Sequence, residues 1–162
     1  MINLENIELI IGNSGRNFSG GTSITIQLLD YQEKEMNLAI LGSRFIPEHF
    51  TTLNYLQFLL LTRTKLPSGK LRVFYTRKNN EMIQGLIAKY IFRSKIKIIF
   101  SSSAQRNHTK FTKWLMSKMD SVVSTSRKAG SYLDKEPDKI ISHGIDLNRF
   151  SLPEDKDKAW QD

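Results

Sequence analysis

Short runs of consecutive apolar residues alternate along the chain with longer stretches in which apolar residues recur at helical spacing. The apolar runs occupy residues 7–11, 36–41, 71–76, 95–100, 121–125 and 139–142. Continuous apolar runs, as opposed to strictly alternating ones, are typical of strands buried on both faces of a parallel sheet. The pattern therefore predicts an α/β fold, a three-layer Rossmann-like domain with a mostly parallel sheet.

The intervening stretches predict helices over residues 23–35, 79–92, 111–119 and 127–134, the last capped by Ser126. Each carries apolar residues on one side, which we expect to face the core. These residues are Ile24, Leu28 and Tyr31; Met82, Ile83, Leu86, Ile87, Tyr90 and Ile91; Phe111, Trp114 and Leu115; and Ala129, Tyr132 and Leu133. Helical spacing favours a core role for Phe111 and Trp114 over a stacking platform for nucleobases.

Two segments give a less direct pattern. Residues 53–62 fit either a helix or a strand, and they are too short to span a bilayer. Residues 151–162 are charged and contain Pro153, which is typical of a linker or a frayed end. We expect one domain over residues 1–150, with residues 151–162 beginning a linker.

Composition narrows the classes of function. The 162 residues include no cysteine, so disulfides and thiolate metal sites are excluded, and the three histidines lack metal-ligand spacing. No metal site and no signal peptide are expected. The net charge of +8 fits either an ordinary solvated surface or an anionic partner, such as nucleic acid, lipid headgroups or a phosphorylated glycan. Nucleic acid is disfavoured because the sequence has no helix-turn-helix spacing, zinc module or aromatic RNP-like strand.

Polar residues follow the predicted strands at the edge where ligands of open α/β sheets bind. They include Arg77, Asn80, Glu81, Arg106 and His108. Arginines bind phosphate, and amides and hydroxyls bind sugar hydroxyls, so this edge suits a phosphorylated saccharide. The alternative is that these residues merely cap helices, as Ser126 does. An acid such as Glu81 is favoured in the first turn of a helix by the dipole alone.

The glycines at 15, 20 and 21 have nearly the spacing of a nucleotide-binding P-loop. Gly21, however, stands where that motif requires lysine, which argues against hydrolysis of a nucleoside triphosphate. Gly20 and Gly21 precede a predicted helix. They fit either anion binding at the helix N-terminus or a tight turn that needs their conformational freedom.

Several motifs resemble those of a known family. They are "FSGGTSITIQLL", the Arg77–Met82 element "RKNNEM", the Gln105–Thr109 element "QRNHT", and "HGIDLNRF" from His143 to Phe150. In this order they resemble the N-terminal half of a GT-B glycosyltransferase of the GT4 type, and bacterial lipopolysaccharide core mannosyltransferases most closely. The resemblance spans nearly the whole chain.

The resemblance implies two Rossmann-like domains with the active site between them. The N-terminal domain would bind a lipid A–core glycan acceptor through Arg77, Asn80, Glu81 and Arg106. The Gly20–Gly21 loop would face the diphosphate of a nucleotide-sugar donor, expected to be GDP-mannose, which acts as a substrate and not as a cofactor. His143, Gly144 and Asp146 would border the interdomain cleft. The family retains anomeric configuration, needs no metal, and implies a cytoplasmic protein peripheral to the inner membrane.

Two departures from the family pattern affect these expectations. No counterpart of the C-terminal domain or its paired glutamates is present, so the chain would be truncated, decayed or completed by a separately encoded domain. An alternative function is therefore an inactive fragment that binds glycans or anions. Ser101, Ser102 and Ser103 also occupy a place where many relatives have a histidine. The catalytic residue is thus unassigned, with His108 as the candidate.

Overall fold

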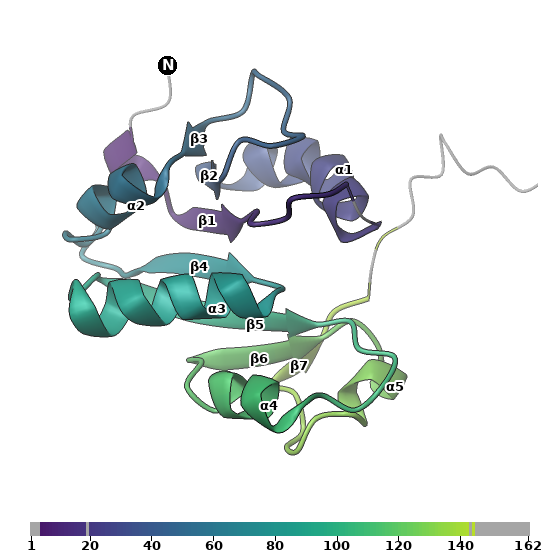
Figure 1. Cartoon of the computed structure of the whole chain (residues 1–162). Helices are drawn as coiled ribbons and strands as arrows, with labels where there is room; N and C mark the ends of the chain where they lie inside the picture. Colours follow the sequence, from purple (N-terminus) through teal and green to yellow (C-terminus); the bar gives the residue numbers. More distant parts are fainter. Residues whose placement is uncertain (1–3, 19, 143, 145–162) are drawn as a thin grey trace, which may run out of the picture.

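The computed structural model describes residues 4–18, 20–142 and 144. Its centre is one seven-stranded sheet in the order β3-β2-β1-β4-β5-β6-β7, and every pairing is parallel (Figure 1). The strands are β1 (Leu9–Gly12), β2 (Leu38–Leu41), β3 (Thr52–Leu53), β4 (Arg72–Thr76), β5 (Ile96–Ser102), β6 (Ser121–Ser124) and β7 (Lys139–Ile140). The α/β, Rossmann-like fold expected from the apolar runs is confirmed.

Helices lie on both faces of this sheet (Figure 1). They are α1 (Gly20–Glu35), α2 (Tyr55–Leu61), α3 (Asn79–Leu86) with its π-helical extension η2 (Ile87–Ile91), α4 (Lys110–Met116) and α5 (Arg127–Gly130). A short 3₁₀ turn, η1 (Leu4–Asn6), precedes β1. Ser126 caps α5 as predicted, because its hydroxyl accepts a hydrogen bond from the amide of Ala129 at 3.0 Å.

Neighbouring strand residues supply two cores on opposite faces of the sheet, as alternating side chains require. Ile10 and Phe74 pack with Phe58 of α2 on one face. Ile11 packs with Leu29 of α1 on the other. The ambiguous segment 53–62 contains both elements: the short strand β3 ends at Leu53, and α2 begins after Asn54. Asn54 and Gln57 form a reciprocal capping box that fixes this start.

The predicted inward face of the first long helix is wrong. In α1 the buried residues are Thr22, Thr25 and Leu29, whereas Tyr31 is exposed. The guanidinium of Arg77 hydrogen-bonds both the carbonyl of Gly21, at 2.6 Å, and the hydroxyl of Thr25. These contacts turn the Thr25 side of α1 toward the strands, and tertiary contact therefore overrides the apolar periodicity.

The predicted face of α3 is also partly wrong, for a packing reason. Met82, Gly85 and Ala88 face the sheet, and a Cβ at Gly85 would lie 2.9 Å from the ring of Phe74. The missing side chain at Gly85 therefore lets the helix approach closely. The π-helical turn then changes which residues face the sheet, because it holds more residues per turn than an α-helix. The predicted core residues Tyr90 and Ile91 lie largely in solvent.

On α4 the structure buries Thr112, Leu115 and Met116 and leaves two predicted core residues outside. Phe111 is 53% exposed and Trp114 is 55% exposed. Leu115 alone among the three predicted residues is buried. Thr112 takes the inward position because its hydroxyl accepts a hydrogen bond from the side-chain amide of Asn79 at 2.9 Å. The prediction of a core role for Phe111 and Trp114 is therefore wrong.

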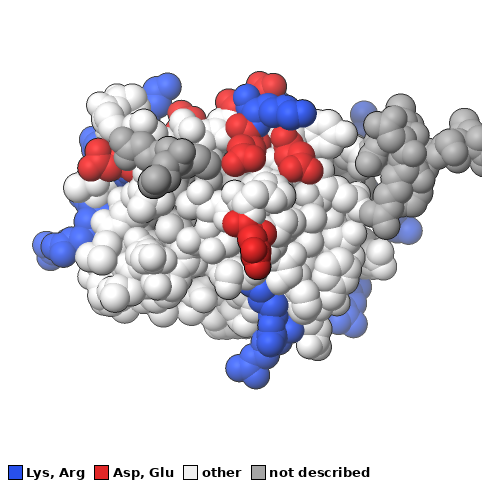
Figure 2. All heavy atoms as spheres, turned by 90° about the horizontal axis from the view of Figure 1, so that it is seen from above, with Lys and Arg blue, Asp and Glu red and all other residues white. Residues whose placement is uncertain are grey.

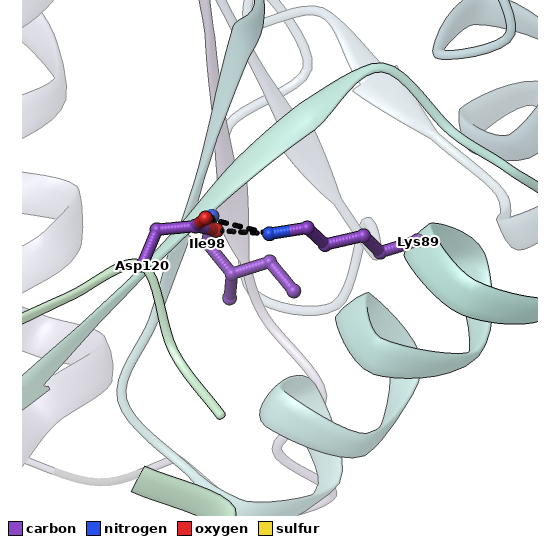
Figure 3. A network of polar contacts seen from close by, with 3 residues as sticks. All are labelled: Lys89, Ile98 and Asp120. Atoms are coloured by element: carbon purple, nitrogen blue, oxygen red, sulfur yellow. Dashed lines mark hydrogen bonds and ion pairs between the residues drawn. The ribbon is translucent and has the colours of Figure 1, made fainter. Parts of the chain in front are cut away.

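Asp120 joins three elements at the start of β6. One carboxylate oxygen accepts a hydrogen bond from the amide of Ile98 at 2.7 Å, and both oxygens lie 2.6 Å from Nζ of Lys89 (Figure 3). Asp120 precedes β6 and therefore lies at the amino edge of the sheet, opposite the edge at which the strands end. It connects β5 and η2, and it is too far from Glu81 to share acid–base chemistry with it.

Candidate functional site

The candidate site lies along the carboxyl edge, where the parallel strands end together. Loops after β1, β4, β5 and β6 meet there, and each leads into a helix. Such an edge collects helix N-termini and loop side chains from segments far apart in sequence. The predicted polar residues Arg77, Asn80 and Glu81 follow β4, and Arg106 and His108 follow β5.

Glu81 is the structural centre of this edge. Its side chain is fully buried and accepts four hydrogen bonds, from the amide and hydroxyl of Ser14 at 3.2 and 3.1 Å and from the amides of Arg77 and Lys78 at 2.7 and 3.1 Å. One carboxylate oxygen accepts the hydrogen bonds from the loop after β1, and the other accepts those from the loop after β4. Glu81 therefore positions the two loops relative to each other. The predicted contact of Glu81 with the acceptor saccharide stays a prediction.

Gly12 makes room for this carboxylate. A Cβ at Gly12 would lie 2.9 Å from Cγ of Glu81 and 3.1 Å from Oε2. Distances this short exclude a side chain unless Glu81 moves. The glycine that ends β1 is thus needed for the close approach of the two loops.

Arg77 extends from the end of β4 toward the beginning of α1. Its guanidinium donates to the carbonyls of Gly21 at 2.6 Å and Gly12 at 3.3 Å, and to the hydroxyl of Thr25. Its Nε atom is buried and has no partner among the described residues. All of these acceptors are neutral, so they orient the guanidinium without forming an ion pair with it. Arg77 thereby brings positive charge to the glycine loop.

A pocket of about 880 Å³ opens beside Arg77. Its polar wall contains Gly20, Gly21, Arg77, Lys78, Ser101, Ser103, Gln105, Thr125, Ser126 and Lys128. Its apolar wall contains Ile11, Ile24, Leu28, Tyr75, Ala104 and Ala129. Three of the described lining residues are cationic and none is acidic. The pocket therefore favours a ligand that carries negative charge, hydroxyl groups and an apolar face.

The structure brings some predicted site residues together and leaves others apart. Gly20, Gly21 and Arg77 line the same pocket. Asn80 is exposed in the first turn of α3, and Arg106 is exposed on the loop between β5 and α4. Both lie at the carboxyl edge, as their positions after β4 and β5 require, but neither lines the pocket. Their predicted contacts with an acceptor remain predictions.

His108 lies on the loop between β5 and α4, outside the pocket. Its Nε2 atom is 3.1 Å from the hydroxyl of Ser102, and its ring meets Phe100 edge-on. Burial lowers the pKa of His108 below its usual 6.5, and the positive charge of Lys113 lowers it further, against a smaller opposing effect of Asp134. The imidazole is therefore neutral near pH 7. This geometry anchors the loop, and catalysis by His108 stays a prediction.

The three residues predicted to border an interdomain cleft fall at the end of the described chain. Gly144 is exposed, with open space where a side chain would lie. His143 and Asp146 lie outside the described residues, as do the predicted domain boundary at 150 and the predicted linker.

Two curated proteins match almost the whole chain. One is the lipopolysaccharide core biosynthesis mannosyltransferase LpcC of Rhizobium leguminosarum bv. viciae, 39% identical over 155 residues. The other is the lipopolysaccharide core biosynthesis mannosyltransferase LpsB of Rhizobium meliloti (strain 1021), 35% identical over 161 residues. The chain is a homologue of lipopolysaccharide core mannosyltransferases. The resemblance expected from the motifs is thereby confirmed, although no protein-family model matches the chain.

These matches cover 95% and 98% of the chain, but only 43% and 45% of the two relatives. The chain thus spans less than half the length of the curated mannosyltransferases that it matches. Among the described residues, no helix is both long enough and apolar enough to cross a bilayer.

Sequence reasoning missed several residues of the pocket in this mannosyltransferase homologue. Ile24 and Leu28 were expected in the core, yet they form part of the apolar wall. Lys78 and Lys128 add positive charge at the rim, and their positions directly after β4 and within α5 could have signalled this. The apolar wall had no such signal, because its residues satisfy the same pattern as a core-facing helix.

Proposed function

We propose that the chain is the acceptor-binding half of a mannosyltransferase that elongates the lipopolysaccharide core. The observation that carries this proposal is Arg77, which brings a guanidinium over the Gly20–Gly21 turn beside a pocket with no acidic residue among its described lining. The homology to core mannosyltransferases supports the choice of acceptor and sugar.

The acceptor saccharide would lie in the pocket between α1 and α5. Arg77 and Lys78 would bind anionic groups on the acceptor, with Arg106 and Asn80 as outer contacts at the same edge. Hydroxyl and amide groups of Ser103, Gln105 and Thr125 would hydrogen-bond its hydroxyls. The half-buried ring of Tyr75 and the neighbouring apolar wall would cover the less polar face of a sugar ring.

The donor would be a nucleotide-sugar, GDP-mannose, bound mainly by the part of the enzyme that corresponds to the remaining length of the relatives. Gly20 and Gly21 are exposed in the first turn of α1, where backbone amides and the positive end of the helix dipole favour a diphosphate. Transfer would retain the anomeric configuration. Gly144, with His143 and Asp146, would border the cleft between the two parts.

A sugar-transfer assay tests the proposal directly. Radiolabelled GDP-mannose and core-deficient lipopolysaccharide would be incubated with the chain alone, with a polypeptide equivalent to the remaining half of LpcC or LpsB, and with both together. We expect product only from the mixture. Product from the mixture that is unchanged by Arg77→Ala would remove Arg77 from the site, and no product under any condition would refute the enzymatic proposal.

A second function has a specific observation in its favour. Because the described pocket lining holds three cations and no acid, the pocket would also suit a glycan- or anion-binding module without catalysis. In that case isothermal titration would detect binding of a phosphorylated core oligosaccharide, while the transfer assay would stay negative with the complementing half present.

The acceptor of the proposed reaction is a glycolipid, so the protein would work at a membrane surface. We place it at the cytoplasmic face of the inner membrane. Its net charge of +8 would favour contact with anionic lipids, each cation near the surface contributing about 1 kcal/mol. Vesicle flotation checks this, and binding that does not weaken with added salt would contradict an electrostatic contribution.

A further inference from the structure

Helix α4 turns an aromatic pair away from the core. Phe111 and Trp114 are each more than half exposed, and their rings stack with centroids 6.1 Å apart and planes inclined by 20°. The opposite side of α4 is already buried through Thr112, Leu115 and Met116. Two adjacent large aromatic rings in water are typical of a surface that a partner covers. Burial of each ring against a partner is favourable.

The charge around this pair is uniformly positive in sequence. Residues 82–119 contain no Asp or Glu. They contain the basic residues Lys89, Arg93, Lys95, Lys97, Arg106, Lys110, Lys113 and Lys118. Asp134 from the neighbouring loop neutralises Lys113, with Nζ 2.5 Å from its carboxylate. Lys110 is exposed at the start of α4, Lys118 is exposed just after the helix, and Arg106 is exposed on the loop before it.

Charge is distributed differently on the face seen from above. There acidic side chains gather toward the middle and one margin, while lysines and arginines project at the periphery (Figure 2). That face has no continuous basic area (Figure 2). The segment from 82 to 119, on the face of the sheet that carries α3 and α4, is the better candidate for contact with an anionic partner (Figure 1).

The first turn of α4 and the pocket lie at the same edge of the sheet. Thr109 caps α4 directly after the loop that leaves the carboxyl end of β5. The side chain of Asn79, two residues after Arg77, donates to the hydroxyl of Thr112 at 2.9 Å. The first turn of α4 thus lies at the edge of the sheet where Arg77 lines the pocket. The pocket itself lies on the other face of the sheet, where Ile11 packs against α1.

We propose that Phe111 and Trp114 of α4 dock the protein on an anionic lipid bilayer. The two rings would enter the headgroup region, and Lys110, Lys118 and Arg106 would lie over lipid phosphates. Aromatic and basic side chains on one helix surface are typical of interfacial binding. The inference rests on the proposed function in that a membrane-bound acceptor makes attachment near the carboxyl edge useful.

A second exposed apolar group provides a matched control. This group consists of exposed Tyr90 and Ile91 at the end of η2 and exposed Phe92 directly after it. The chain then enters β5, and the amide of Ser94 donates a hydrogen bond to the carbonyl of Ala88 at this turn. The three exposed residues lie at the amino edge, separated from the pocket by the length of β5, roughly 20 Å for seven residues. Docking through this group would instead bring the amino edge of the sheet to the membrane.

Tryptophan fluorescence tests the proposal without any sugar substrate. The sequence contains two tryptophans, so Trp160→Phe makes Trp114 the sole emitter. This variant would be titrated with phosphatidylcholine vesicles with and without phosphatidylglycerol, and with brominated lipid as a quencher. We expect a shift of the Trp114 emission to shorter wavelength and quenching by brominated lipid, both strongest with phosphatidylglycerol. Absence of either change on anionic vesicles would overturn the proposal.

Vesicle flotation of surface variants is the second test of docking through α4. We expect Phe111→Ser with Trp114→Ser to lower partitioning by roughly tenfold or more. Lys110→Gln with Lys118→Gln should lower it by roughly tenfold on anionic vesicles only. Ile91→Ser with Phe92→Ser should change it less than twofold. Equal or greater loss in this control pair would overturn docking through α4. Since these side chains are exposed, unchanged thermal unfolding would show that the variants fold.

The two proposals fail separately in these experiments. The vesicles contain no lipopolysaccharide, so binding through α4 does not depend on sugar transfer. Vesicle binding without mannose transfer would refute the enzymatic function alone. Transfer to a water-soluble acceptor together with no vesicle binding would refute the docking alone.

Discussion

Gly12 and Glu81 occupy adjoining space at the carboxyl edge, so closely that a methyl group on Gly12 would lie 2.9 Å from Cγ of Glu81. This contact joins the end of β1 to the first turn of α3, which are 69 residues apart in the sequence (81 − 12). The space that Gly12 leaves is filled by the carboxylate that holds both loops of the candidate site.

We expect Gly12→Ala to destabilise the protein by about 1–3 kcal/mol, because the added methyl forces Glu81 away from its four donors. Chemical denaturation measures the loss. Gly20→Ala is the matched control, since a Cβ at Gly20 meets nothing within 4 Å. Equal destabilisation by the two changes would show that the contact with Glu81 is not the cause.

Glu81→Gln tests the charge of the same group at nearly constant volume. A glutamine amide offers one oxygen and one NH₂ group to four donors, so two of those donors would lose their acceptor. We expect a loss of about 2–4 kcal/mol in unfolding free energy. Glu33→Gln on the exposed side of α1 should stay within about 0.5 kcal/mol. A Glu81→Gln variant as stable as the wild type would contradict the positioning role.

Arg77 should account for much of the affinity for an anionic saccharide. Removal of one charged hydrogen-bonding group costs about 1.5–3 kcal/mol, or roughly 10- to 100-fold in the dissociation constant. We expect Arg77→Ala to weaken binding of a phosphorylated core oligosaccharide by this factor in isothermal titration. Arg106→Ala, exposed at the same edge, should weaken it less.

Arg63→Ala controls for the change in net charge in that titration. Arg63 is exposed just after α2. The preceding residue, Thr62, hydrogen-bonds Ser94, which lies just before the start of β5. Arg63 therefore lies at the amino edge of the sheet, opposite the pocket. Its removal should leave the affinity unchanged. An equal loss in Arg63→Ala and Arg77→Ala would mean that binding depends on overall charge and not on the pocket.

The strands could be predicted from sequence because their apolar runs are local signals that the parallel sheet then satisfies. The orientation of the helices could not, because it depends on contacts between distant segments. Gly85 determines which side of α3 faces the sheet, because it leaves room for the ring of Phe74. Arg77 determines which side of α1 faces the sheet, because it hydrogen-bonds Gly21 and Thr25. Both effects oppose the apolar periodicity of the helix concerned.

The candidate site was likewise predictable in its location but not in its detailed contacts. Its location followed from parallel topology, so residues after β1 and β4 were correctly placed at one edge. The buried hydrogen bonds of Glu81 had no sequence signal, since an acidic residue in the first turn of a helix is favoured by the dipole alone. Arg106 was predicted alongside Arg77 from its position after a strand, but the direction of its loop leaves it outside the pocket lining.

Asp120 and Lys89 should differ in their contributions to stability, although they form one ion pair (Figure 3). Lys89→Ala removes a partly exposed salt bridge, which typically contributes less than about 1 kcal/mol. Asp120→Ala also deprives the amide of Ile98 of its acceptor and should cost about 1–2 kcal/mol more. Denaturation of both variants and of the double variant measures this difference. Equal losses would show that the Ile98 hydrogen bond contributes nothing.

His108 should make stability depend on pH. Burial lowers its pKa in the folded protein below the value of about 6.5 expected when unfolded, so the unfolded chain binds more protons between the two values. Its contribution is therefore fully present above about pH 6.5 and is lost as the pH falls through the lower, folded pKa. Protonation also removes the lone pair of Nε2 that can accept the Ser102 hydroxyl.

The measurement is the difference in unfolding free energy between wild type and His108→Gln across this pH range. The variant retains a polar side chain but cannot titrate, so the difference isolates His108 from the carboxylates that titrate at lower pH. We expect the wild type to lose stability relative to His108→Gln as the pH falls below about 6.5. Parallel pH profiles would show that the imidazole titrates alike in the folded and unfolded states, and would refute its partly buried, neutral role in anchoring the loop.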